Sequence, residues 1–171
     1  MELDILHAIQ GWHWAPIDMV MVLLSTLGNL GLIWIALSLV LLISPKTRVM
    51  SLTIMGAMAL SFIFGNLLLK NIVARARPFM VDTSVTLLIP HPNEYSFPSG
   101  HTLNGITAAT VIFLYSRKAG IFALILAAAI AFSRLYLFVH YPTDILGGIL
   151  LGIADALIAY MIARKISKRK E

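Results

Sequence analysis

Apolar residues fill most of this chain in long blocks, and short polar segments separate the blocks. A helix needs about 20 residues to cross the hydrocarbon core of a bilayer, and several blocks approach or exceed that length. We therefore predict an all-α fold, a polytopic transmembrane helix bundle that forms a single domain over residues 1–171. The five spans that we expect are roughly Ile17–Ile43, Val49–Leu69, His101–Tyr115, Ile121–Val139 and Pro142–Ile162.

The N-terminal residues 1–15 form a separate, shorter element. The segment Leu3–Ile9 has the pattern of a short amphipathic helix, and Trp12 and Trp14 suit the membrane interface. This element is interfacial, re-entrant or a sixth short span, and the pattern leaves these three alternatives open. The first long block contains Gly28-Asn29-Leu30-Gly31, a sequence that can break or bend a helix.

Composition excludes a soluble globular protein. Of the 171 residues, 59% are hydrophobic and 12% are charged, and the mean hydropathy is +0.88. The chain has no cysteine, so neither a disulfide nor a thiolate metal site is available. A secretory signal peptide is not expected, because Glu2 and Asp4 stand where its positive region would lie.

The distribution of lysine and arginine predicts the orientation in the membrane. Basic residues between the first and second spans, between the third and fourth, and in the tail 164–171 are best explained as cytoplasmic. Because this pattern accounts for most of the formal net charge of +5, we do not expect nucleic acid as a partner. Four basic residues then lie at the outer ends of the spans, where we expect an anion to compensate their charge: Lys70, Arg75, Arg77 and Arg134. The long polar connection 79–97 is predicted to be an outer loop or lid.

The first candidate segment contains Lys70 and Arg77, which are seven residues apart. Two helical turns separate them, so we expect them on one face of the second span, with Pro78 ending that helix. Snorkelling at the interface is the alternative explanation. Two cations on one face at the outer side favour anion binding.

The second segment is Pro98-Ser99-Gly100-His101, at the expected start of a helix. Ser99 can cap the helix, Gly100 permits close backbone approach, and free N–H groups at a helix N-terminus bind anions. An ordinary serine cap would explain Ser99 alone. His101 in the first turn favours a functional role, as an acid or base beside a phosphate.

The third segment contains Arg134, His140 and Asp144, with Pro142 suited to the first helical position. Asp144 lies one helical turn after His140 and can accept a hydrogen bond from one ring nitrogen. The other nitrogen would then be unprotonated and directed outward, as in an activated nucleophile. A purely structural His–Asp pair is the alternative. The guanidinium of Arg134 suits phosphate oxygens.

Together the three segments contain the groups that phosphoryl transfer needs. They offer a nucleophile, a second histidine for the leaving oxygen, and cations for the phosphoryl oxygens. Two histidines and an aspartate could also bind zinc, but three neighbouring cations would oppose it. We therefore expect no metal and no cofactor.

The spacing of these residues resembles the signatures of the type 2 phosphatidic acid phosphatase superfamily. Six residues separate Lys70 from Arg77-Pro78, the tetrad begins at Pro98, five residues separate Ser133-Arg134 from His140, and three separate His140 from Asp144. The resemblance implies a metal-independent membrane phosphatase with a phosphohistidine intermediate, and six spans in most members. It implies the following roles: His140 as nucleophile, Asp144 as its partner, His101 as general acid and then base, and Lys70, Arg77, Ser99, Gly100 and Arg134 as phosphate-binding residues.

The small size resembles bacterial members that act on envelope lipids at the outer face of the inner membrane. The candidate substrates are lipid A 1-phosphate, undecaprenyl pyrophosphate and phosphatidylglycerol phosphate, and we favour an enzyme similar to lipid A 1-phosphatase. A lipid-to-lipid phosphotransferase and a non-catalytic anion-binding or lipid-binding membrane protein are the alternatives. The expected partners are a phosphorylated lipid and the bilayer, with no obligatory protein partner.

Overall fold

The structure is a computed structural model that describes residues 1–168. Within this range the chain is all-helical, as predicted, and contains no strand. The elements in order are α1 (Glu2–Gln10), α2 (Ala15–Gly28), the 3₁₀ turn η1 (Asn29–Gly31), α3 (Leu32–Ile43), α4 (Arg48–Ser61), the π-helical η2 (Phe62–Leu69), α5 (Lys70–Val73), α6 (Pro78–Val81), α7 (Gly100–Tyr115), α8 (Arg117–Tyr136) and α9 (Pro142–Ser167).

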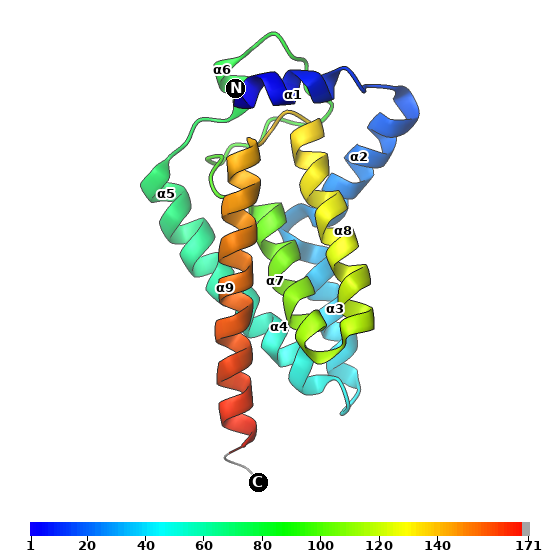
Figure 1. Cartoon of the computed structure of the whole chain (residues 1–171), viewed down its shortest axis with the longest axis vertical. Coiled ribbons are helices and arrows are strands. Elements are labelled where there is room, and N and C mark those ends of the chain that lie inside the picture. Colours follow the sequence, from blue (N-terminus) through cyan, green and yellow to red (C-terminus); the bar gives the residue numbers. More distant parts are fainter. Residues whose placement is uncertain (169–171) are drawn as a thin grey trace.

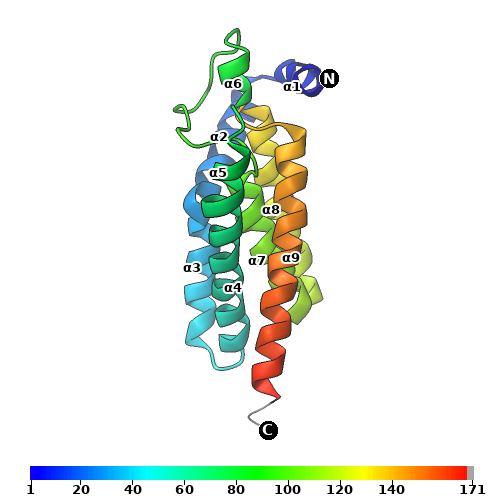
Figure 2. The same cartoon turned by 90° about the vertical axis from the view of Figure 1, so that its left-hand side faces the viewer.

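The long helices run side by side as a bundle, and α7 lies at its centre (Figures 1 and 2). Helix α7 packs against α8, α9 and α4, and small residues allow these close approaches. A β-carbon on Gly105 would lie 3.2 Å from Ala127 Cβ in α8, and one on Gly148 would lie 3.0 Å from the Ser99 carbonyl oxygen. The core contains Trp34, Leu103 and Ile130.

The described residues contain four segments long and apolar enough to cross a membrane: Ala15–Ile43, Arg48–Val81, Arg117–Tyr136 and Pro142–Ser167. Many large apolar side chains on these segments point outward rather than into the bundle, as expected of a membrane protein. The central helix α7, with 16 residues, is shorter than these four segments.

The first long block is broken where the glycine pattern indicated. Leu30 has φ 52° and ψ 13°, and Gly31 has φ 69°, so two successive residues adopt the left-handed region and the helix axis changes direction. The break separates α2 from α3. Helix α2 lies in the same half of the bundle as α5 (Figure 2).

The prediction that Lys70 and Arg77 share a helix face is wrong. Helix α5 ends at Val73, where Ala74 adopts φ 46° and ψ 39°, so Pro78 does not end it. Instead Arg77 has extended φ and ψ, and Pro78 opens the short helix α6. The two cations therefore come from different local structures.

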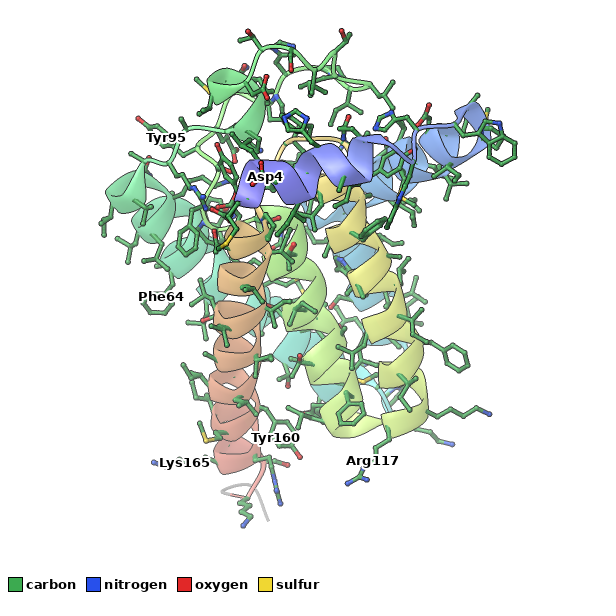
Figure 3. All side chains as sticks on the ribbon, turned by 45° about the horizontal axis from the view of Figure 1, so that its top comes forward. Asp4, Phe64, Tyr95, Arg117, Tyr160 and Lys165 are labelled. Carbon is green, nitrogen blue, oxygen red and sulfur yellow. The ribbon has the colours of Figure 1, made fainter. Side chains whose placement is uncertain are left out.

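The predicted N-terminal helix is present as α1, which lies across one end of the bundle (Figure 1). Figure 3 shows Asp4 and Tyr95 at this end, whereas Arg117 and Lys165 lie at the opposite end. Helix α9 continues through Ser167, so the first residues of the predicted tail are helical. Residues 169–171 of that tail lie outside the described residues.

Candidate active site

A cavity of about 490 Å³ opens at the end of the bundle that carries α1. Six of the eight predicted site residues line it: Lys70, Arg77, Gly100, His101, Arg134 and His140. Residues far apart in sequence therefore meet at one place, as the charge pattern indicated. Five residues of the predicted outer loop also line this cavity: Ile89, Pro90, Pro92, Asn93 and Glu94.

His140 lies in the short connection between α8 and α9, and its ring is 2% exposed. Its Nδ1 is 3.4 Å from Asp144 Oδ2, and its Nε2 is 3.2 Å from Arg77 Nη1. A carboxylate oxygen accepts and a guanidinium donates, so Nδ1 bears the proton and Nε2 holds the lone pair. Burial lowers the pKa of His140 to about 3, so the ring is neutral at neutral pH.

Asp144 is fully buried in the first turn of α9. Its Oδ1 accepts a hydrogen bond from Arg75 Nη1 at 2.7 Å. Its Oδ2 accepts from the Ser96 hydroxyl and from the Tyr141 backbone N–H at 2.8 Å. This network fixes the carboxylate beside His140 from several directions.

Arg75 also connects the site to α1. Its Nη2 donates to Glu2 Oε2 at 2.5 Å, and its guanidinium lies 3.9 Å from the centre of the Tyr141 ring. Glu2 in turn accepts from the Thr143 backbone N–H at 3.1 Å. Burial opposes ionisation of Glu2, but these hydrogen bonds outweigh it and lower its pKa.

Arg77 is 3% exposed, and backbone carbonyls hold its guanidinium in place. It donates to the carbonyl oxygen of Val139 at 2.8 Å and to that of Glu94 at 2.6 Å. The same group reaches His140, so it can present N–H donors to an anion bound at that nitrogen.

Lys70 is 6% exposed and pairs with the carboxylate of Glu94. The hydrogen bond from the ammonium group lowers the pKa of Glu94. The protein itself therefore supplies part of the negative charge that we expected to compensate the outer cations. The same holds for Arg75 with Glu2 and Asp144.

The second histidine, His101, lies in the first turn of α7. Its Nε2 is 3.1 Å from the Ser25 carbonyl oxygen and 3.0 Å from Asn29 Oδ1. Arg134, 3% exposed, donates through Nη1 to the Ser25 hydroxyl. Within residues 1–168, Arg134 Nε is buried without a hydrogen-bond partner, which leaves a donor beside the cavity for a ligand.

Ser99 and Asp144 are the two predicted site residues that do not line the cavity. The Ser99 side chain caps α7, as predicted, and accepts from the Thr102 backbone N–H at 3.5 Å. A β-carbon on Gly100 would lie 3.9 Å from Lys70 Nζ, so the N-terminus of α7 comes close to this cation.

Strained backbone lies next to these groups. Within the described chain, the non-glycine residues with positive φ are Leu30, Ala74 and Phe138. Each is one or two residues from a site group, namely Asn29, Arg75 and His140. Such strain is characteristic of functional sites.

Within residues 1–168, no group of three or more His, Cys, Asp or Glu side chains is placed to hold a metal ion. His140 and Asp144 form one pair, and His101 bonds to other partners.

The sequence pattern missed Ser25, Asn29, Arg75, Glu94 and Ser96. Arg75 was visible as an outer basic residue, and Asn29 lay in the predicted break. Ser25 and Ser96 gave no signal, because their roles depend on contacts with residues 109 and 48 positions away.

The fold and the site define a helical membrane protein with a cavity at one end of its bundle that is lined by two histidines and three cationic side chains. Residues 51–168 match the PAP2 superfamily, and the chain belongs to this family. This result confirms the resemblance drawn from the three signatures.

Named relatives and a solved structure agree with this assignment. The chain is 36% identical over 139 residues to an undecaprenyl-diphosphatase of Sulfolobus acidocaldarius, covering 81% of this chain and 66% of that protein, just under two thirds of its length. It is 30% identical over 155 residues to the undecaprenyl-diphosphatase BcrC of Bacillus subtilis, covering 90% of this chain and 79% of that protein. The crystal structure of a transmembrane PAP2 type phosphatidylglycerolphosphate phosphatase from Bacillus subtilis has the same fold, with a TM-score of 0.77 at 24% identity over 95% of this chain and 84% of that one.

Proposed function

We propose that this protein is a metal-independent membrane phosphatase that removes a phosphate from a lipid through a phosphohistidine at His140. The observation that carries the proposal is the geometry of His140: Nδ1 faces Asp144, and Nε2 faces the cavity beside Arg77. A neutral imidazole with its lone pair on the cavity side is ready to attack phosphorus.

In the first step, His140 Nε2 forms a bond to phosphorus while the bond from phosphorus to the leaving oxygen breaks. His101, protonated on both ring nitrogens, gives one of these protons to that oxygen. In the second step, His101 takes a proton from water, the water oxygen attacks phosphorus, and the bond to Nε2 breaks to release phosphate. Lys70, Arg77 and Arg134, with the N-terminus of α7 at Ser99 and Gly100, stabilise the charge on the phosphoryl oxygens in place of a metal.

We favour a polyprenyl diphosphate such as undecaprenyl diphosphate as the substrate. Both sequence relatives described above are named undecaprenyl-diphosphatases. Lipid A 1-phosphate and phosphatidylglycerol phosphate also present a terminal phosphoryl group, bonded to a carbon-linked oxygen rather than to a second phosphate, and form the other arms of the test.

For the membrane topology, we propose five spans, with α7 as the additional one. Its 16 residues lie at the centre of the bundle between helices that are long enough to span. Helix α1, with nine residues, is too short to span and is proposed to lie along the interface. Arg117 and Lys165, at the opposite end, favour a cytoplasmic C-terminus and an outer active site in the plasma membrane.

The test is phosphate release from the three lipid phosphates by the purified full chain in detergent, with and without EDTA. We expect release that EDTA does not abolish, a base-stable and acid-labile phosphoenzyme, and no activity in His140→Ala. His91→Ala is the matched control, because His91 is exposed in the outer loop and does not line the cavity. Activity that survives in His140→Ala, or that EDTA abolishes, would contradict the mechanism. Labelled phosphate that appears on a second lipid would identify a transferase instead.

A further inference from the structure

The end of α2 forms one wall of the cavity, although it lies outside the three segments that carry the predicted site. Ser25, Gly28 and Asn29 line the cavity together with His101 and Arg134. Asn29 directly precedes Leu30 and Gly31, whose φ angles are positive. The strained break in the backbone therefore lies next to the cavity wall.

The break makes the Ser25 carbonyl oxygen available to His101. In a continuous α-helix this oxygen would accept the backbone N–H of residue 29. Here the Asn29 N–H bonds to the Thr26 carbonyl oxygen instead. The freed Ser25 oxygen lies 3.1 Å from His101 Nε2, and Asn29 Oδ1 lies 3.0 Å from the same nitrogen.

These contacts determine which nitrogen of His101 carries the proton. A carbonyl oxygen only accepts, so Nε2 bears the hydrogen. In the neutral ring Nδ1 then holds the lone pair, and within the described chain no residue bonds to it. Nδ1 is thus the nitrogen available for proton exchange with a bound substrate.

Ser25 also contacts the neighbouring cation. Its hydroxyl accepts a hydrogen bond from Arg134 Nη1, so one residue holds His101 through its backbone and Arg134 through its side chain. Gly28 allows this proximity, because a β-carbon there would lie 2.7 Å from His101 Cδ2 and 2.7 Å from Ile130 Cγ2.

We propose that Asn29 and Ser25, at the end of the broken helix, are positioning residues for the reaction: Asn29 acts through His101, and Ser25 acts through Arg134 and, with its carbonyl oxygen, through His101. Asn29, with the Ser25 carbonyl, keeps one proton on Nε2, so that in the imidazolium form the proton on Nδ1 is the one directed to the leaving oxygen. The Ser25 hydroxyl sets the guanidinium of Arg134 for the phosphate. This inference rests on the proposed function and extends it to residues outside the three signatures.

The first test compares two leaving groups in Asn29→Leu. A phosphate monoester of an alcohol, such as phosphatidylglycerol phosphate, needs a proton on its leaving alkoxide oxygen, whereas p-nitrophenol leaves readily without one. We expect kcat for phosphatidylglycerol phosphate to fall by about 10- to 100-fold, and kcat for p-nitrophenyl phosphate to change much less. Asn29→Asp retains an acceptor oxygen and should recover part of the loss. Asn71→Leu, the same change on exposed α5 outside the cavity, should behave like the wild type.

The second test uses Ser25→Ala, which removes the hydroxyl and keeps the carbonyl. We expect KM to rise about tenfold, as for loss of a hydrogen bond to a charged group, with the dependence on the leaving group unchanged. An equal loss with both leaving groups in Asn29→Leu, or no loss, would overturn the role of Asn29. An unchanged KM in Ser25→Ala would overturn the role of the hydroxyl.

A measurement independent of activity separates this inference from the proposed function. Nitrogen NMR of histidine-labelled wild-type protein, with His101 assigned by its absence in His101→Asn, should show the Nε2–H tautomer, and Asn29→Leu should shift that signal. A proton on Nδ1 alone would overturn the inference. Wild-type protein that shows the expected tautomer but releases no phosphate would refute the proposed function while leaving the orientation of His101 in place.

Discussion

The guanidinium of Arg77 lies 3.2 Å from His140 Nε2, the ring nitrogen opposite the one that faces Asp144. The proposed nucleophile is thus held between an anion and a cation, with its lone pair toward the cation. The same guanidinium is anchored on the carbonyl oxygens of Val139 and Glu94. Because the cation is fixed independently of His140, it can remain in place when a phosphoryl group binds between them.

Arg77→Lys should therefore be a severe change although it preserves charge. A lysine ammonium cannot bond to Val139, Glu94 and His140 with the geometry of the planar guanidinium. We expect kcat/KM for lipid phosphate release to fall by about 10²- to 10³-fold, the cost of one donor to transition-state charge. Steady-state kinetics of the purified variant measures this. Activity within a fewfold of the wild type would show that charge alone suffices.

Arg75 should affect turnover more than substrate binding. It donates to Asp144 Oδ1 and does not line the cavity, so it acts on His140 only through the carboxylate. We expect Arg75→Gln and Asp144→Asn each to lower kcat by about 10- to 100-fold with little change in KM. The double variant should lose little more than Asp144→Asn alone, because coupled residues are not additive. If the losses in kcat of the two single variants were fully additive in the double variant, Arg75 would not act on His140 through Asp144.

The sequence predicted the helical class, the break at Gly28–Gly31 and the meeting of the charged segments, because spacing and hydropathy determine these features. It failed at Arg77. A helical register was extended through residues 74–77, whereas Ala74 adopts a left-handed conformation that no local residue type predicts. Ser25 and Ser96 were missed for a related reason, since a serine acquires its role from distant partners and neither spacing nor composition reveals them.

Gly148 should be intolerant of alanine. A β-carbon there would lie 3.0 Å from the Ser99 carbonyl oxygen and 3.2 Å from the Leu103 backbone nitrogen, and backbone atoms cannot easily move aside. We expect Gly148→Ala to destabilise the protein by about 1–3 kcal/mol, as overpacking does, and to lower activity by separating α7 from α9. Thermal unfolding in detergent checks this.

Gly56→Ala is the matched control for Gly148→Ala. No atom lies within 4 Å of a β-carbon at Gly56, and alanine favours helix over glycine. Its Tm should equal or exceed that of the wild type. A similar loss in both variants would indicate that helix propensity, and not the contact between α7 and α9, governs the effect.

The stability of the protein should fall as pH decreases from 6.5, and His140 should contribute to the fall. Its folded pKa is about 3, against an ordinary value of 6.5, so the unfolded chain binds a proton that the folded chain does not. Stability is therefore lost as pH drops below 6.5, by about 2 kcal/mol at pH 5 for such a shift. Glu94 has a pKa lowered from 4.5 by Lys70, so its contribution to stability is present above pH 4.5 and is lost only at lower pH.

Between pH 7 and pH 5, Tm should accordingly fall less in His140→Asn than in the wild type. The exposed control His91→Asn should keep the wild-type dependence. Equal decreases in Tm for His140→Asn and the wild type would show that His140 is not buried as a neutral ring.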